Sequence, residues 1–546
     1  MFPRLALPPS NAVLAGVALV LLVPGLAGHD LWKASDAISV EIAHEMLRTG
    51  NWLLPRMVDE PWFDASPLYF WIAALLGRML GWWLPFHGSA RVASGLLFLL
   101  ALWMLFRTAR AWSVEEDRRI FPASALLIFL GAIGLIVRTH EAGPGMGGLA
   151  AICAAMAALA RGTERTTDLK GALLWGAAFG AALGAVFLFT GPIAPVTIAI
   201  AALIALFACD EWRVARVGAF MALGLALAFA ISAIWPLLLH ARSPGIAAAW
   251  WSEALRTQGS FALNLRASIV TASWFCWPAW PLAAWAIWSL RDRWREPRLL
   301  LPAAMVGTAL LAASVFGDAW EFGSSALLPP LALLAAQAIA RLPRGAAGAL
   351  DWFSVMAFTF FAALVWLGYA AIMTGFPPRI AHNLARLAPG FVAKIEWLPV
   401  IFAVLLVPTW AYLVLRTPPS PARAVTRWAA GVAMLWASFA SLLLPWADYQ
   451  KSYVPVAQAI RRHIPAQATC VASRGLGWAQ RAALHYHGQI ATVTWNPFEP
   501  FACTLLLVQG QPGNELDSPG KLWIKVAEMG RPGDRGELLR LYQHAQ

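Results

Sequence analysis

The sequence predicts a polytopic α-helical membrane protein that carries a small α/β domain at its C-terminal end. Of its 546 residues, 60% are hydrophobic and only 13% are charged, whereas soluble proteins are about one quarter charged. Apolar runs of about 17–25 residues, long enough to cross a bilayer as a helix, recur as far as residue 446. Residues 447–546 lose this pattern and alternate strand-like and helix-like segments.

The apolar runs and the arginines between them predict thirteen membrane spans. If every run crossed the membrane, the arginine-rich loops 107–119 and 291–298 would lie outside, although Lys and Arg prefer cytoplasmic loops. The run 67–84 contains Arg78 and ends in GWWLP, an aromatic cluster typical of the interface. Excluding this run places those loops and the N-terminus inside and the C-terminal domain outside. The candidate runs are 10–28, 67–84, 91–107, 120–137, 144–160, 171–189, 191–208, 216–240, 268–290, 299–316, 324–340, 352–374, 398–415 and 428–446.

The net charge of +12 lies in short loops between apolar runs and does not gather on one soluble face. This distribution sets membrane topology and argues against a nucleic-acid partner. The first apolar run lacks a small-residue cleavage site, so we expect it to be retained as a helix.

These patterns divide the chain into a transmembrane domain, 1–446, and an extracytoplasmic C-terminal α/β domain, 447–546. Within the first domain, residues 29–90 form a long outer loop with helices on the membrane surface. In the second, ATCVAS and FACTLLLVQG read as strands on either side of the helix-like WAQRAALHYHG. Cys470 and Cys503 lie at the edges of these strands, where either a disulfide or two buried thiols fits the sequence.

The first outer loop concentrates carboxylates beside a very apolar chain. Ser35 or Asp36 can cap a helix that runs to about Gly50, with an apolar stripe at helical spacing and with Glu41 and Glu45 on its water-exposed face. Asp64 follows in PWFDASP, just before the run 67–84. Carboxylates at an anionic membrane surface are unfavourable, so we expect a metal ion or a reacting group between them.

Three motifs of this loop, EIAHEM, GNWLLP and WFDASP, occur in an order and spacing that is similar to the first outer loop of bacterial aminoarabinose (lipid A) transferases. The chain also resembles the related protein-mannosyltransferase-like group; both groups are GT-C glycosyltransferases. Weaker matches are FLFTGPIAP, RTHEAGPGM, SWFCWPAWPLAAWAIW and SSALLPPLALL, so the resemblance covers roughly 30–445 in order.

The resemblance implies a GT-C fold and a lipid-linked donor. A sugar on a polyprenyl phosphate would be transferred with inversion to a hydroxyl group of a lipid, a glycan or a protein, as in lipid A modification of the cell envelope. The expected location is the bacterial inner membrane, with the active site and the C-terminal domain in the periplasm.

The chemistry needs a general base, a cationic phosphate site and, in one version, a divalent metal ion. We expect Asp36 to be the base, Glu141 to be a second acid brought near it, and His140 to assist or orient. Asp64 would bind the metal or orient the site. The candidate donor-binding residues are Arg56, Arg138, Arg256, Arg266 and Thr190.

The sequence departs from the family pattern at five positions. The family's Asp-Glu pair falls on Ser35 and Asp36, its next Glu falls on Asp64, and its two lysines fall on Ala65 and Thr190. These losses keep open a non-catalytic glycosyltransferase-like subunit. A lipid or sugar transporter is a further alternative, but the chain shows neither internal repeats nor charged spans after residue 171.

Overall fold

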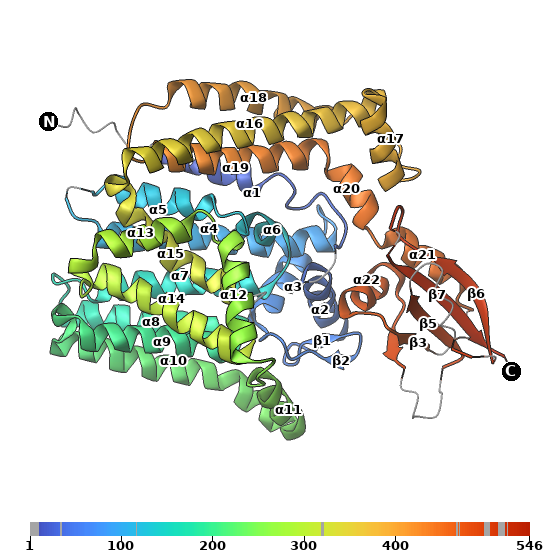
Figure 1. The fold of residues 1–546 in the computed structure, drawn as a ribbon. Helices are drawn as coiled ribbons and strands as arrows, with labels where there is room; N and C mark the ends of the chain where they lie inside the picture. The colour runs from blue at the N-terminus through green and yellow to red at the C-terminus, as the bar shows by residue number, and fades with distance from the viewer. Residues whose placement is uncertain are drawn as a thin grey trace.

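The computed structural model shows a body of helices with a five-stranded sheet domain beside it (Figure 1). It describes residues 10–545 except 33–34, 116, 318–321, 466–467, 469, 496–502, 511–518, 521 and 535. The fold class predicted from the sequence, a polytopic helical membrane protein with a small C-terminal α/β domain, is confirmed. The boundary at residue 446 stays a prediction.

Several helices of the described chain are long and apolar enough to cross a membrane. An eighth span results if α19 (Arg423–Leu442) and the helical run Leu444–His463, bent by 69° relative to it, count as one. The seven helices that meet this condition singly are α4 (Phe86–Trp112), α7 (Pro144–Gly162), α8 (Leu169–Thr190), α10 (Ala215–Arg242), α14 (Pro297–Phe316), α16 (Arg344–Thr374) and α18 (Trp397–Arg416). Shorter helices of the body are α1 (Asn11–Leu22), α3 (Leu68–Leu80), α5 (Ile120–Leu130), α6 (Leu135–His140), α9 (Ile193–Ala208), α11 (Pro244–Ala254), α12 (Phe261–Phe275), α13 (Ala279–Ser289), α15 (Phe322–Ala338) and α17 (Pro378–Leu387).

The count of thirteen spans therefore stays a prediction, and so does the sidedness. The 13 residues of α3 extend only about 20 Å at 1.5 Å per residue. This is less than the roughly 30 Å of the hydrocarbon core, but α1 is equally short with 12 residues, so helix length does not test the exclusion of run 67–84.

Two runs that we expected to be single spans are broken in the structure. Run 120–137 divides between α5 and α6, and run 268–290 divides between α12 and α13. The two breaks lie against each other, because the Gly134 amide donates to the Phe275 carbonyl at 3.0 Å. A Cβ atom at residue 134 would overlap the Phe275 ring, so glycine permits this close approach.

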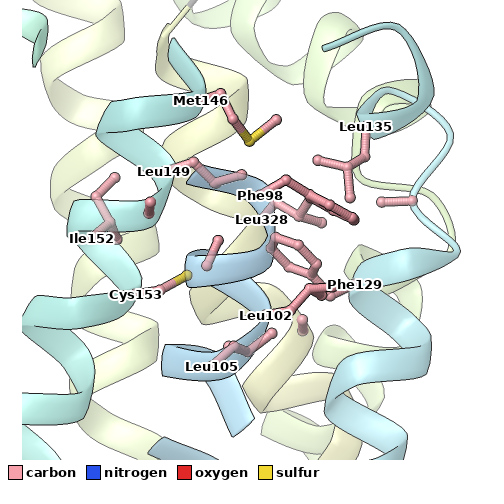
Figure 2. Packing of buried hydrophobic residues seen from close by; sticks show 14 of the residues in the cluster. Phe98, Leu102, Leu105, Phe129, Leu135, Met146, Leu149, Ile152, Cys153 and Leu328 are labelled. Carbon is pink, nitrogen blue, oxygen red and sulfur yellow. The ribbon is translucent and has the colours of Figure 1, made fainter. Parts of the chain in front are cut away.

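The core of the body is made by facing helices that meet through large apolar side chains. Figure 2 shows Phe98, Leu102 and Leu105 of α4 packed among residues of α5, α7 and α15. Cys153 of α7 lies in this cluster and is fully buried, so it serves as a small apolar side chain. This packing fixes α4 and α7, the two helices on which the site described below depends.

The first outer loop folds as a helix, a hairpin and a second helix. The expected helix is confirmed as α2 (Ser35–Thr49). Strands β1 (Arg56–Met57) and β2 (Glu60–Pro61) are joined by the two residues Val58 and Asp59. Both have positive φ, 49° and 65°, as the tight turns of two-residue hairpins require. A β-branched residue in this conformation is strained, and the buried Val58 side chain is held there by packing.

The C-terminal domain is a mixed sheet with the strand order β4-β3-β5-β7-β6. The first three strands pair in parallel, and β7 pairs antiparallel with β5 and β6. Cys470 and Cys503 form a disulfide across 33 residues, which settles the alternative left open by the sequence. The elements are α20 (Leu444–Lys451), α21 (Val454–His463), β3 (Val471–Arg474), α22 (Trp478–Gly488), β4 (Thr492–Thr494), β5 (Leu505–Gly510), β6 (Trp523–Met529) and β7 (Leu538–His544).

The expectation that Glu41 and Glu45 form the water-exposed face of α2 is wrong. Their residues are 0% and 2% exposed, because α22 of the C-terminal domain packs against α2 and covers them (Figure 1).

Candidate active site

A small cavity of about 60 Å³ is lined by four of the nine residues predicted for the site, Asp64, Arg138, Glu141 and Thr190. It lies where the start of α2, the segment before α3, the α6–α7 loop and the end of α8 meet. Ser35, Asp64, Arg138, Glu141 and Thr190 all line it, although more than 150 residues separate the first from the last. The fold thus brings two carboxylates, a guanidinium and two hydroxyl groups to one place.

Glu141 and Arg138 face each other in this cavity, with 3.9 Å between the nearest carboxylate and guanidinium atoms. Their side chains are 18% and 20% exposed, so both charges are partly desolvated yet reachable. The Glu141 backbone carbonyl accepts a hydrogen bond of 2.7 Å from Ser94 of α4, which fixes the loop. A carboxylate in this position can accept a proton, and the guanidinium beside it can bind a phosphate group.

The start of α7 forms one wall of the cavity. Pro144 is its first residue, and Gly143, Gly145 and Met146 line the cavity with it. The amide groups in the first turn of a helix have no intrahelical acceptor and favour anions. A Cβ atom at residue 143 would lie 2.5 Å from Ser35 Oγ, so glycine lets the loop approach α2 closely.

Asp36, the expected base, lies behind the cavity wall and not in the cavity. Its side chain is 0% exposed, and Arg91 of α4 pairs with it at 2.6 Å. Oδ1 also accepts from the Ala142 amide at 2.8 Å, and Oδ2 from the Trp32 amide at 3.4 Å. Because both oxygens are occupied, this geometry does not fit a base for an acceptor hydroxyl. It fits a residue that positions its neighbours Ser35 and Glu141.

Arg91 was not identified from the sequence, where it stands at the start of the run 91–107. It is fully buried and also donates to the carbonyl groups of His29 and Asp30, at 2.6 and 2.7 Å. The available signal was its place inside an apolar helix, since a charge in a membrane segment usually has a partner.

Lowering the pH should remove the contribution of Asp36 to the stability of the fold. Burial alone would raise its pKa, but the charge and hydrogen bonds of Arg91 outweigh burial and hold the pKa below 3.8. The carboxylate therefore stabilises the fold above pH 3.8, and this contribution disappears as the pH falls through the folded pKa. We expect Asp36→Asn to lower the midpoint of thermal unfolding at pH 7, and the difference from the wild type to shrink below about pH 4. Thermal unfolding between pH 3 and 7 checks this, and a difference that does not change with pH contradicts it.

His140 also points away from the cavity. Its Nε2 lies 2.9 Å from the Leu21 carbonyl of α1 and 2.9 Å from Trp436 Nε1 of α19. Burial lowers its pKa to about 4, so it is neutral at pH 7. These contacts fit a packing role between helices and do not fit the expected assistance to the base.

Three of the expected phosphate ligands do not line the cavity. Arg56 donates to the Asp59 carbonyl within its own hairpin at 3.4 Å. Arg256 pairs with Glu253 at 2.6 Å, and Arg266 is exposed on α12. Arg138 and Thr190 are the donor-binding candidates that the structure brings together, and the Thr190 hydroxyl donates to the Val186 carbonyl at 2.8 Å.

Possible metal ligands occur in two places in this structure. Asp64 is an exposed carboxylate on the cavity, whose oxygen donors suit Mg²⁺ or Mn²⁺ when a lipid phosphate completes the shell. Among the described residues, the group of three side chains with metal-ligand spacing is a different one, Glu41, Glu45 and His485.

Comparison with known proteins finds relatives among bacterial arabinosyl transferases. No family model matches the chain. The undecaprenyl phosphate-α-4-amino-4-deoxy-L-arabinose arabinosyl transferase of Pectobacterium carotovorum is 26% identical over 233 residues, which is 43% of this chain and 40% of that protein. A second such transferase, from Pseudomonas fluorescens, is 26% identical over 311 residues, 54% of this chain and 49% of that protein. A third such transferase, from Enterobacter, is 29% identical over 126 residues, which is 22% of this chain and 22% of that protein. The chain thus spans less than half the length of these relatives.

Among solved structures, ArnT of Cupriavidus metallidurans bound to undecaprenyl phosphate superposes with a TM-score of 0.70 at 18% identity, covering 97% of both chains. This chain has the GT-C fold. The overlap includes the C-terminal domain, because it extends over nearly the whole chain. The archaeal oligosaccharyltransferase AglB of Archaeoglobus fulgidus, in complex with an inhibitory peptide and a dolichol-phosphate, matches with a TM-score of 0.51 at 12% identity. That match covers 89% of this chain and 64% of the archaeal one.

Proposed function

We propose that this GT-C protein is a membrane glycosyltransferase. It moves a sugar, in line with its relatives' names a pentose, from a polyprenyl phosphate to a hydroxyl group of a lipid, a glycan or a protein. The cavity that brings Asp64, Glu141 and Arg138 together beside an apolar groove carries this proposal. The proposed location is the bacterial inner membrane, with the N-terminus cytoplasmic and the site periplasmic.

The apolar groove offers a place for the prenyl chain. It has a volume of about 780 Å³ and lies among α8, α9, α10 and α11. Phe187 and Pro192 line it, whereas Phe189 and Thr190, the last two residues of α8, line the polar cavity. A lipid tail in the groove would therefore place its phosphate beside Arg138. The packing of Trp235, which donates to the Leu53 carbonyl at 2.8 Å, ties the groove to the first outer loop.

In the proposed reaction, the acceptor oxygen forms a bond to the anomeric carbon while the bond from that carbon to the phosphate oxygen breaks. The polyprenyl phosphate leaves with the electron pair, and the sugar inverts. Glu141 takes the acceptor proton, and Arg138 with the first-turn amides of α7 holds the phosphate charge. A divalent ion held by Asp64 would add positive charge next to the leaving phosphate. Asp36 acts through Ser35 and the 141–143 loop as a positioning residue.

A transfer assay in reconstituted vesicles tests the proposal. Polyprenyl-phosphate sugars extracted from cells are supplied, and acceptor lipids, glycans and proteins are analysed for an added sugar. Transfer by the wild type supports the enzyme. Movement of the donor lipid across the bilayer without transfer would instead support the transporter, and absence of both would support the non-catalytic subunit.

Filling the groove should weaken donor binding. Ala233 of α10 lines it, and we expect Ala233→Trp to raise KM for the polyprenyl donor by roughly tenfold or more, because a bulky ring excludes part of the chain. The matched control is Ala363→Trp on the exposed surface of α16. Steady-state kinetics at varied donor concentration checks this, and equal effects in the two variants contradict it.

A further inference from the structure

The contact between the helical body and the C-terminal domain contains three side chains that could ligate a metal. Glu41 and Glu45 stand one turn apart on α2 and face His485 of α22. One ligand atom from each lies within 4.8 Å of the other two. The side chains of Glu41 and Glu45 are 0% and 2% exposed, and that of His485 is 15% exposed.

One oxygen of this group has no partner. Glu41 Oε1 accepts a hydrogen bond from His485 Nδ1, but Glu41 Oε2 is buried and has no hydrogen-bond partner in the described structure. A buried carboxylate oxygen without a partner is costly. The cost disappears if an ion occupies the space that this oxygen faces.

We propose that Glu41, Glu45 and His485 bind a divalent metal ion of the zinc class. Carboxylate oxygens and an imidazole nitrogen are zinc ligands, and three protein ligands leave a fourth position for water. The spacing of four residues on α2 puts both carboxylates on one face. The ion takes the place of the proton between His485 Nδ1 and Glu41, and that proton leaves to solvent or moves to His485 Nε2.

Arg48 completes the surroundings of the proposed ion. Its Nε and Nη2 donate to the two oxygens of Glu45 at 2.9 and 2.7 Å. A carboxylate has about four lone-pair sites, so Glu45 can keep these bonds and still ligate. Such a second partner orients a metal ligand.

The ion links the C-terminal domain to the helix that starts the active site. The other end of α2 is Ser35, which lines the cavity. A second link between the same parts is the ion pair of Glu60 with Arg481 of α22, at 2.5 Å. Metal binding at α2 therefore holds the outer domain on the loop that shapes the cavity, and this inference does not depend on the proposed activity.

Zinc binding to the full-length protein in lipid nanodiscs tests the inference. After treatment with a chelator and its removal, ZnCl₂ is added, and zinc content and thermal unfolding are measured. We expect about one zinc per chain and a rise of roughly 2–4 °C or more in the unfolding midpoint. In Glu41→Gln and His485→Asn we expect zinc affinity to fall by at least about tenfold, with no rise in the midpoint.

The controls remove the same residue types elsewhere in the C-terminal domain. His463→Asn and Glu528→Gln change exposed side chains outside the proposed ligand set and should keep the zinc. Equal loss in all four variants, or no zinc in the wild type, overturns the proposal. X-ray absorption of the wild-type zinc gives an independent result if the ligand variants do not fold. One imidazole with oxygen ligands supports the site, and sulfur ligands or several imidazoles overturn it, since His44, His87 and His487 lie nearby.

Discussion

Glu141→Gln is expected to lower the rate of sugar transfer by about 10²–10⁴-fold, the usual contribution of a general base. The substitution keeps the shape of the side chain and removes the proton acceptor beside Arg138. If Glu141 acts on the acceptor proton, kcat falls while KM for the polyprenyl donor stays close to the wild-type value. Initial rates at saturating and limiting donor concentrations measure both quantities.

Arg138→Gln provides the contrasting variant. Because Arg138 is proposed to hold the donor phosphate, its loss should raise the donor KM as well as lower kcat. Glu115→Gln is the matched control for Glu141, since the Glu115 side chain is 88% exposed and pairs with Arg118 away from the cavity. Wild-type transfer by a folded Glu141→Gln protein contradicts the assignment. A loss of transfer in Asp64→Asn with normal transfer in Glu141→Gln would give the role of base to Asp64.

Arg91→Met is expected to destabilise the protein by about 3–5 kcal/mol, the usual cost of removing one partner from a buried ion pair. The substitution leaves the Asp36 carboxylate buried without its cation, and it also leaves the His29 and Asp30 carbonyl groups without their donor. The measurement is the free energy of unfolding, or the midpoint of thermal unfolding, at pH 7. The double variant Arg91→Met with Asp36→Leu should recover part of the loss, because it no longer buries a lone charge.

The control for this prediction is Arg118→Met. Arg118 pairs with Glu115 at 3.3 Å, but the two side chains are 59% and 88% exposed, so removal of the pair should cost at most about 1 kcal/mol. An equal cost of Arg91→Met and Arg118→Met would show that the buried pair does not stabilise the packing of α2 against α4.

Four residues that the sequence analysis assigned to the site line one cavity in the structure: Asp64, Arg138, Glu141 and Thr190. The resemblance of the first outer loop supplied Asp64, the weaker match FLFTGPIAP supplied Thr190, and the short outer loop after the run 120–137 supplied Arg138 and Glu141. Residues of this kind can be found from sequence because each lies next to a motif or a helix end.

Asp36 shows where this reasoning fails. It neighbours Ser35 in the sequence, but successive residues on a helix point about 100° apart. Ser35 lines the cavity, and Asp36 turns toward Arg91 of α4. Which of the two side chains faces the cavity depends on how α2 packs against α4 and the 141–143 loop, and local sequence does not contain that information.

Three features can be predicted without a structure: a polytopic helical membrane domain, an α/β C-terminal domain and an amphipathic helix in the first outer loop. These features follow from composition and periodicity, which are properties of each segment alone. What covers each polar face is set by the fold. It buried Glu41 and Glu45 under α22, paired Asp36 with Arg91 and turned His140 toward Trp436. The physical reason is that periodicity shows which side of a helix is polar, whereas the burial of that side and the partners of its charges depend on elements hundreds of residues away.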